Sequence, residues 1–90
     1  MTPTARQTGL PAGTFSTKVT VLYGTSVVPS TFQAVLEGTD VTSLSHPVPG
    51  GREAVSIPLV TGRNVLKLSV SGSVGARSAS DQDQLVFLVR

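Results

Sequence analysis

The stretch from Gly62 to Arg90, GRNVLKLSVSGSVGARSASDQDQLVFLVR, decides the fold class of this 90-residue chain. Apolar residues alternate with other residues in two runs of the stretch: Leu66, Leu68 and Val70 in the first, Leu85, Phe87 and Val89 in the second. A period of two is typical of a strand with one buried face. The Gly, Ser and Ala residues between the runs predict a long loop, and the whole stretch therefore predicts a β-hairpin.

The rest of the chain repeats this pattern, and no segment shows the apolar spacing of a helix. Further strands are expected over residues 15–23, 31–37, 40–44 and 52–60. Turns or loops are expected over residues 24–30, 37–39, 45–51 and 61–64, where Gly, Pro, Ser and Asn gather. Pro58 cannot donate a ladder hydrogen bond, which predicts a sheet edge or a non-bonded position for it.

About six or seven short antiparallel strands at this spacing indicate an all-β sandwich with Greek-key connections, with a small barrel as the alternative. The length fits one domain, expected over residues 15–90 and preceded by a tail or linker over residues 1–14. Phe15 and Tyr23 share the core side of the first strand. The expected core consists of Val19, Val21, Phe32, Leu36, Val55, Ile57, Leu66, Leu68, Val70, Leu85 and Phe87.

The composition excludes several classes of protein. The chain has no Cys, which excludes disulfides and thiolate metal sites. Its seven basic residues are scattered, whereas nucleic-acid binders concentrate them, and no apolar run approaches the length of a membrane span. We therefore expect no nucleic-acid partner, no membrane insertion and no small-molecule ligand.

No set of residues predicts catalysis, a cofactor or a metal centre. His46, the one histidine, precedes Pro47 in an expected loop, and the chain has no nucleophile elbow around a Ser. Asp81 and Asp83 share one side of a strand and could supply two ligands to Ca²⁺. Capping of backbone N–H groups or pairing with an Arg is the favoured interpretation. Asn64 is expected to serve its turn through side-chain-to-backbone hydrogen bonds.

Two features predict a contact beyond the domain itself. Val86 and Leu88 lie on the opposite side of the last strand from the expected core residues, so both sides of that strand are apolar. We expect them to contact a neighbouring domain or a second copy. The chain ends on strand residues, and we expect it to be a piece of a longer protein with a second domain soon after Val89.

Two segments resemble bacterial immunoglobulin-like or fibronectin-III-like modules: TFQAVLEGTDVT over residues 31–42, and GRNVLKLSVSGSVG over residues 62–75. Glu37 stands where that pattern usually carries Asn, and the Cys–Trp–Cys core of antibody domains is absent. The resemblance implies a module of a multidomain secreted or cell-surface bacterial protein, acting as a spacer, an adhesive unit or a packing partner of neighbouring domains or other proteins.

A non-catalytic structural or binding module is therefore the expected function. The alternative is an accessory domain of a secreted carbohydrate-active or other hydrolase. Sugar-binding domains use exposed aromatic side chains, whereas Tyr23 and the three Phe residues all fall on core positions of their strands. Two or more aromatic side chains exposed in a flat row would favour the alternative.

Overall fold

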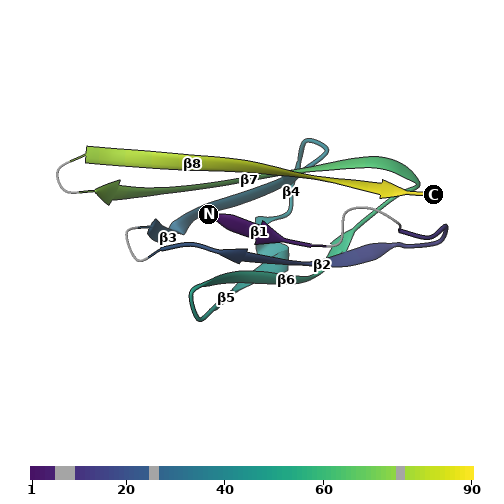
Figure 1. Ribbon diagram of the computed structural model, residues 1–90, viewed down its shortest axis with the longest axis horizontal. Coiled ribbons are helices and arrows are strands. Elements are labelled where there is room, and N and C mark those ends of the chain that lie inside the picture. Colours follow the sequence, from purple (N-terminus) through teal and green to yellow (C-terminus); the bar gives the residue numbers. More distant parts are fainter. Residues whose placement is uncertain (6–9, 25–26, 75–76) are drawn as a thin grey trace.

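The computed structural model describes residues 1–5, 10–24, 27–74 and 77–90. Within these residues the fold is all-β, with eight strands and one turn of 3-10 helix: β1 (Thr2–Thr4), β2 (Ser16–Leu22), β3 (Val27–Leu36), β4 (Thr39–Asp40), η1 (Thr42–Leu44), β5 (Ser45–Val48), β6 (Gly51–Pro58), β7 (Gly62–Val74) and β8 (Arg77–Val89). They form two antiparallel sheets, ordered β1-β2-β6-β5 and β4-β3-β7-β8. The sheets lie in two layers, an arrangement compatible with a β-sandwich (Figure 1).

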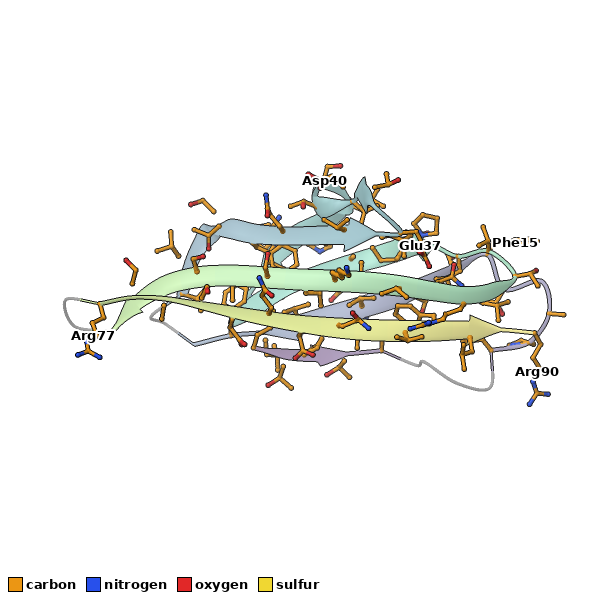
Figure 2. All side chains as sticks on the ribbon, turned by 90° about the horizontal axis from the view of Figure 1, so that it is seen from above. Phe15, Glu37, Asp40, Arg77 and Arg90 are labelled. Carbon is orange, nitrogen blue, oxygen red and sulfur yellow. The ribbon has the colours of Figure 1, made fainter. Side chains whose placement is uncertain are left out.

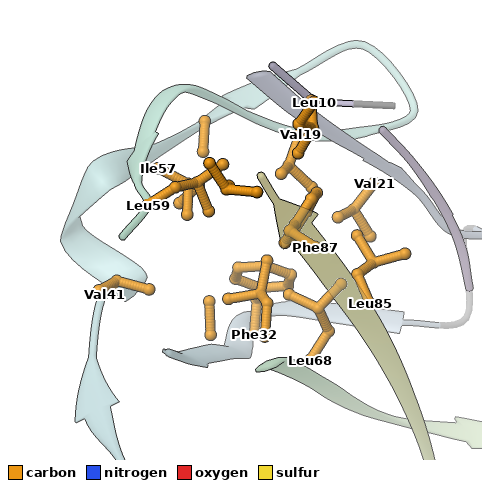
Figure 3. Packing of buried hydrophobic residues seen from close by; sticks show 14 of the residues in the cluster. Leu10, Val19, Val21, Phe32, Val41, Ile57, Leu59, Leu68, Leu85 and Phe87 are labelled. Carbon is orange, nitrogen blue, oxygen red and sulfur yellow. The ribbon is translucent and has the colours of Figure 1, made fainter. Parts of the chain in front are cut away.

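The core lies between the two sheets, and most of the expected core residues are buried in it (Figure 3). The confirmed residues are Val19, Val21, Phe32, Ile57, Leu66, Leu68, Val70, Leu85 and Phe87. Leu36 is half-buried and packs against this cluster. The core also includes Leu10, Ala34, Val41, Ala54, Leu59 and Val89.

A bulge in β6 changes which of its residues face the core. Thr17 pairs with Ile57, whereas Val19 pairs with Ala54, so β6 carries one extra residue between these two pairs. Ala54 and Ile57 are both buried as a result, which strict alternation of Val55 and Ile57 does not predict. The side chain of Val55 lies outside what the structure describes. Pro58 lies beyond the end of β5 and has only β2 as a neighbour, in agreement with its expected edge position.

The prediction of a loop over residues 45–51 is wrong, because these residues belong to the hairpin of β5 and β6. Val48 pairs with Gly51 across a turn of Pro49 and Gly50. Gly50 has a positive φ of 79°, as the third residue of a type II turn requires, and Pro at the position before it is common in that turn. The Pro and Gly residues thus reverse the chain, and the residues on both sides of them pair.

The long loop predicted between the last two strands is also wrong. β7 and β8 pair without interruption from Gly62 opposite Val89 to Val74 opposite Arg77. Small polar side chains do not prevent this pairing, since backbone groups make the ladder bonds. The tight turn expected over residues 61–64 is likewise replaced by strand from Gly62 onwards. Gly72, expected in the long loop, pairs with Ala79, and residues 75 and 76 lie outside what the structure describes.

Strand β3 begins earlier than predicted, and the strand expected after it is shorter. Val27 and Val28, expected in a connection, pair with β7, and the register then shifts before Gln33. The Thr31 hydroxyl bridges this irregularity: it accepts the Ser71 N–H, and its single proton lies between the backbone oxygens of Val28, at 2.6 Å, and Ser71, at 3.0 Å. Of residues 40–44, only Asp40 belongs to β4, because the Asp40 carboxylate accepts the Thr42 N–H and the chain turns into η1.

The described part of residues 1–14 is not a free tail, which corrects that expectation. Thr2–Thr4 pairs with β2, and Leu10 is buried and forms a parallel bridge with Val89. Leu10 belongs to the core cluster, and Met1 and Ala5 pack against it. Phe15, expected to face the core, is 79% exposed because it precedes β2, and its backbone oxygen accepts the Leu59 N–H.

Gly51 should be the glycine least tolerant of substitution among those described. A Cβ added there would overlap the backbone oxygen of Val21 in the neighbouring strand, whereas at Gly24 it would meet nothing within 4 Å. We expect Gly51→Ala to lower the free energy of unfolding by about 2–3 kcal/mol. Gly24→Ala should change it by less than about 0.5 kcal/mol. Urea denaturation of both variants measures the difference, and equal stabilities would contradict the close approach of β2 and β6.

Candidate contact face

A group of four apolar side chains lies on the outer face of the β4-β3-β7-β8 sheet, and Val28, opposite Ser71, lies further along the same face. Val65 pairs with Val86, Arg63 with Leu88, and Val35 with Lys67. Directly paired residues share a face, so Val35, Val65, Val86 and Leu88 lie together on the side away from the core. Leu88 is 49% exposed, and the three valines are half-buried. Figure 2 looks onto this sheet. This face, including Arg63 and Lys67, is called the contact face below.

The contact face is hollowed. Two shallow hollows of about 640 and 390 Å³ lie side by side on it and share Val35, Lys67 and Gln84 in their lining. Gln82 and Asp83 contribute to the first hollow, and Arg63 and Val65 to the second. A convex or knob-like surface of another molecule could seat here, with apolar contact at the valines and hydrogen bonds at the amide side chains.

The charge of the contact face is weakly positive. Arg63 and Lys67 are exposed on it, and no described carboxylate forms an ion pair with either side chain. The nearby Glu37 carboxylate accepts the Val65 N–H at 2.9 Å, so it is engaged by the backbone. Acidic groups on a partner would therefore meet two available cations at the edge of the apolar cluster.

Glu37 also holds the turn between β3 and β4 against β7. Glu37 and Gly38 have φ values of 47° and 82° and form the two-residue turn between β3 and β4. Positive φ at both central residues defines a type I′ turn, which favours Asn at the first position. At Glu37 the hydrogen bond to the Val65 N–H, together with that from the Glu37 N–H to the Val65 oxygen at 3.1 Å, ties the turn to β7.

The two aspartates lie at the rim of the core face, as expected, and bind protein groups. The Asp83 carboxylate accepts the Gln84 N–H at 2.9 Å, so it caps a backbone group as expected, but the donor is the next residue of the same strand and not a loop. Asp81 is 2.7 Å from the amino group of Met1, and that hydrogen bond and charge lower the pKa of Asp81. In the part of the chain that the structure describes, no three His, Cys, Asp or Glu side chains come close enough to hold a metal ion.

His46 and Asn64 differ in their exposure to solvent. His46 is exposed on β5, opposite Glu53 on β6. Asn64 is 1% exposed and bonds to the backbone of Val60, Gly62 and Phe87, which confirms the predicted side-chain-to-backbone hydrogen bonds, although Asn64 itself lies in β7 and not in a turn.

Arg52 occupies an inward position that the sequence does not reveal. Its guanidinium lies over the Phe32 ring, 5.2 Å from the ring centre, and donates to the Ser45 hydroxyl and backbone oxygen. Regular alternation with Ile57 would have directed Arg52 to solvent. The β6 bulge reverses that direction, and no local sequence signal marks the bulge.

Exposed aromatic side chains do not form a row among the described residues. Phe15 is exposed and Tyr23 is half-buried, but they lie at opposite ends of β2. Phe32 and Phe87 are buried. The condition that would have favoured the carbohydrate-binding alternative is therefore not met in this part of the chain.

Comparison with known proteins yields no match to a protein-family model, a curated protein or a solved structure. In the described part of the chain, no helix is long and apolar enough to span a membrane.

Proposed function

We propose that this chain is a non-catalytic, immunoglobulin-like module of a larger, secreted or cell-surface bacterial protein. The strand order supports the immunoglobulin-like assignment. Reading β1, β2, β3, β5, β6, β7 and β8 as strands A to G gives A-B-E-D in one sheet and C-F-G in the other. This is the order of an immunoglobulin constant-type sandwich, with β4 added beside strand C.

The module acts by contact with a neighbouring domain or another protein through the contact face. The observation that carries this proposal is the grouping of Val35, Val65, Val86 and Leu88 on a solvent-facing, hollowed sheet surface. Clustered apolar side chains on an outer face are typical of an interaction site. Arg63 and Lys67 favour a partner with acidic groups around an apolar centre.

Backbone hydrogen exchange tests the proposal. The chain is compared alone and joined to one flanking domain of its natural gene product, about 100 residues. We expect slower exchange along β3, β7 and β8 in the longer protein, and loss of this protection in Leu88→Glu. Leu22→Glu is the matched control, because Leu22 is similarly exposed, at 47%, on the other sheet.

Two outcomes would contradict the proposal. The first is unchanged exchange on the contact face in the longer protein. The second is a natural gene product made of these 90 residues alone. A catalytic domain as the flanking partner would favour the alternative of an accessory domain of a hydrolase.

A further inference from the structure

Strand β8 is a long, regular edge strand. It is the outermost strand of the sheet ordered β4-β3-β7-β8 and pairs with β7. The other outer strands are short, with three residues in β1, two in β4 and four in β5, whereas β8 has 13. β8 also contains no Pro or Lys, two residues that commonly block further pairing at an edge.

The hydrogen bonds of β7 show which groups of β8 point outward. Both the N–H and the C=O of Ser71 face the Thr31 hydroxyl on the β3 side, at 2.8 and 3.0 Å, and Ser71 pairs with Ser80. Opposed residues in an antiparallel ladder either exchange both bonds or neither, so the Ser80 N–H and C=O point away from β7. At the other end of the strand, the Arg90 N–H also points outward and donates to the Leu10 oxygen.

In the described part of the chain, no residue pairs with the outward groups of Ser78, Ser80 and Gln82 in the first part of β8. At the other end of β8, Val89 already forms a parallel bridge with Leu10. The Gln84 N–H donates to the Asp83 carboxylate. Figure 1 shows the β7–β8 hairpin extending past β1 at the end where residues 77–83 lie, and Figure 2 shows Arg77 at that tip.

The charges of this segment suit pairing with itself. If two β8 strands pair antiparallel about Ser80, Arg77 lies opposite the partner's Asp83, and the even-numbered residues exchange backbone bonds. Two-fold symmetry makes this charge pair twice. If the two strands instead paired about residue 81, each Asp81 would lie opposite the partner's Asp81. Like charges directly opposite are unfavourable.

We propose that residues 77–83 of β8 pair antiparallel with the same residues of a second copy of this chain, joining two β4-β3-β7-β8 sheets into one continuous sheet. The interaction uses the sheet edge and is separate from the contact face.

Exchanging the charges at positions 77 and 83 tests the proposed register of the two β8 strands. Sedimentation equilibrium should detect a monomer–dimer equilibrium of the unmodified chain below about 1 mM. Arg77→Asp and Asp83→Arg should each weaken the dimer by about tenfold or more, and the double variant R77D/D83R should restore it to within about threefold. Leu88→Glu, on the contact face, should leave it unchanged. Thermal melting verifies that every variant is folded.

Engineered cysteines test the same register independently, since the chain has no cysteine of its own. Ser80→Cys should form an intermolecular disulfide on mild oxidation, because the two Cα atoms would lie about 5.5 Å apart. Ser78→Cys is the matched control and should form no such disulfide, because position 78 would lie opposite position 82 of the partner and not opposite its own copy.

Three outcomes would overturn the proposal: a chain that stays monomeric, a double variant that fails to restore pairing, or equal cross-linking of the two cysteine variants. Dimerisation lost only in Leu88→Glu would overturn it in favour of association through the contact face.

Discussion

Asn64→Asp should lower the free energy of unfolding by about 3–5 kcal/mol at pH 7, since an unpaired charge would be buried. The Asn64 amide nitrogen donates to the backbone oxygens of Val60, Gly62 and Phe87, at 2.9, 3.2 and 3.4 Å. A carboxylate cannot donate and would face these three oxygens. The change keeps the size of the side chain, so the loss reports its charge and hydrogen bonds.

The effect of Asn64→Asp should depend on pH. Burial and the facing oxygens raise the pKa of the new carboxyl in the folded state above its unfolded value of about 3.9. The charge-dependent part of the destabilisation is therefore absent below the unfolded pKa. It grows as the pH rises towards the folded pKa and is complete above it. Urea denaturation of the variant and the unmodified protein at about pH 4 and pH 7 measures this difference.

Asn64→Leu is the matched control for charge. It removes the same hydrogen bonds without adding a titrating group, so its destabilisation should be the same at both pH values. An equal effect of Asn64→Asp at both pH values would contradict the buried position of this side chain.

Phe32→Ala should lower the free energy of unfolding by about 3–5 kcal/mol, whereas Phe15→Ala should change it by less than about 0.5 kcal/mol. Phe32 is 4% exposed and Phe15 is 79% exposed, although alternation gives both a core position. Loss of the Phe32 ring leaves a cavity between the sheets and removes the surface on which Arg52 lies. Chemical denaturation of both variants checks the prediction, and similar losses for the two would show that Phe15 also packs in the core.

Alternation predicted the core-facing side correctly wherever a strand is regular. Leu66, Leu68 and Val70 on β7, and Leu85 and Phe87 on β8, are all buried, because an uninterrupted ladder preserves the period of two. The contact-face position of Leu88 follows from the same period. These predictions depend only on local sequence.

Irregularities and turns account for what the sequence did not predict. The bulge in β6 depends on how it pairs with β2, far away in the chain, so neither the burial of Ala54 nor the inward position of Arg52 is visible locally. Pro49 and Gly50 predict a loop, although they occupy only the two central positions of a turn. The Ser-rich segments also predict loops, but their pairing is set by the register of the whole hairpin.

The uninterrupted β7–β8 hairpin has a consequence for how the chain folds. Its strands are joined by a very short connection, so its contacts form at little entropic cost of loop closure. Pairing of β2 with β6 instead requires residues around Val21 and Arg52 to meet across β3, β4 and β5. Non-local pairings of this kind slow folding. The hairpin is therefore expected to form in microseconds, and closure of the β2–β6 pair to limit the rate at which the native state is reached.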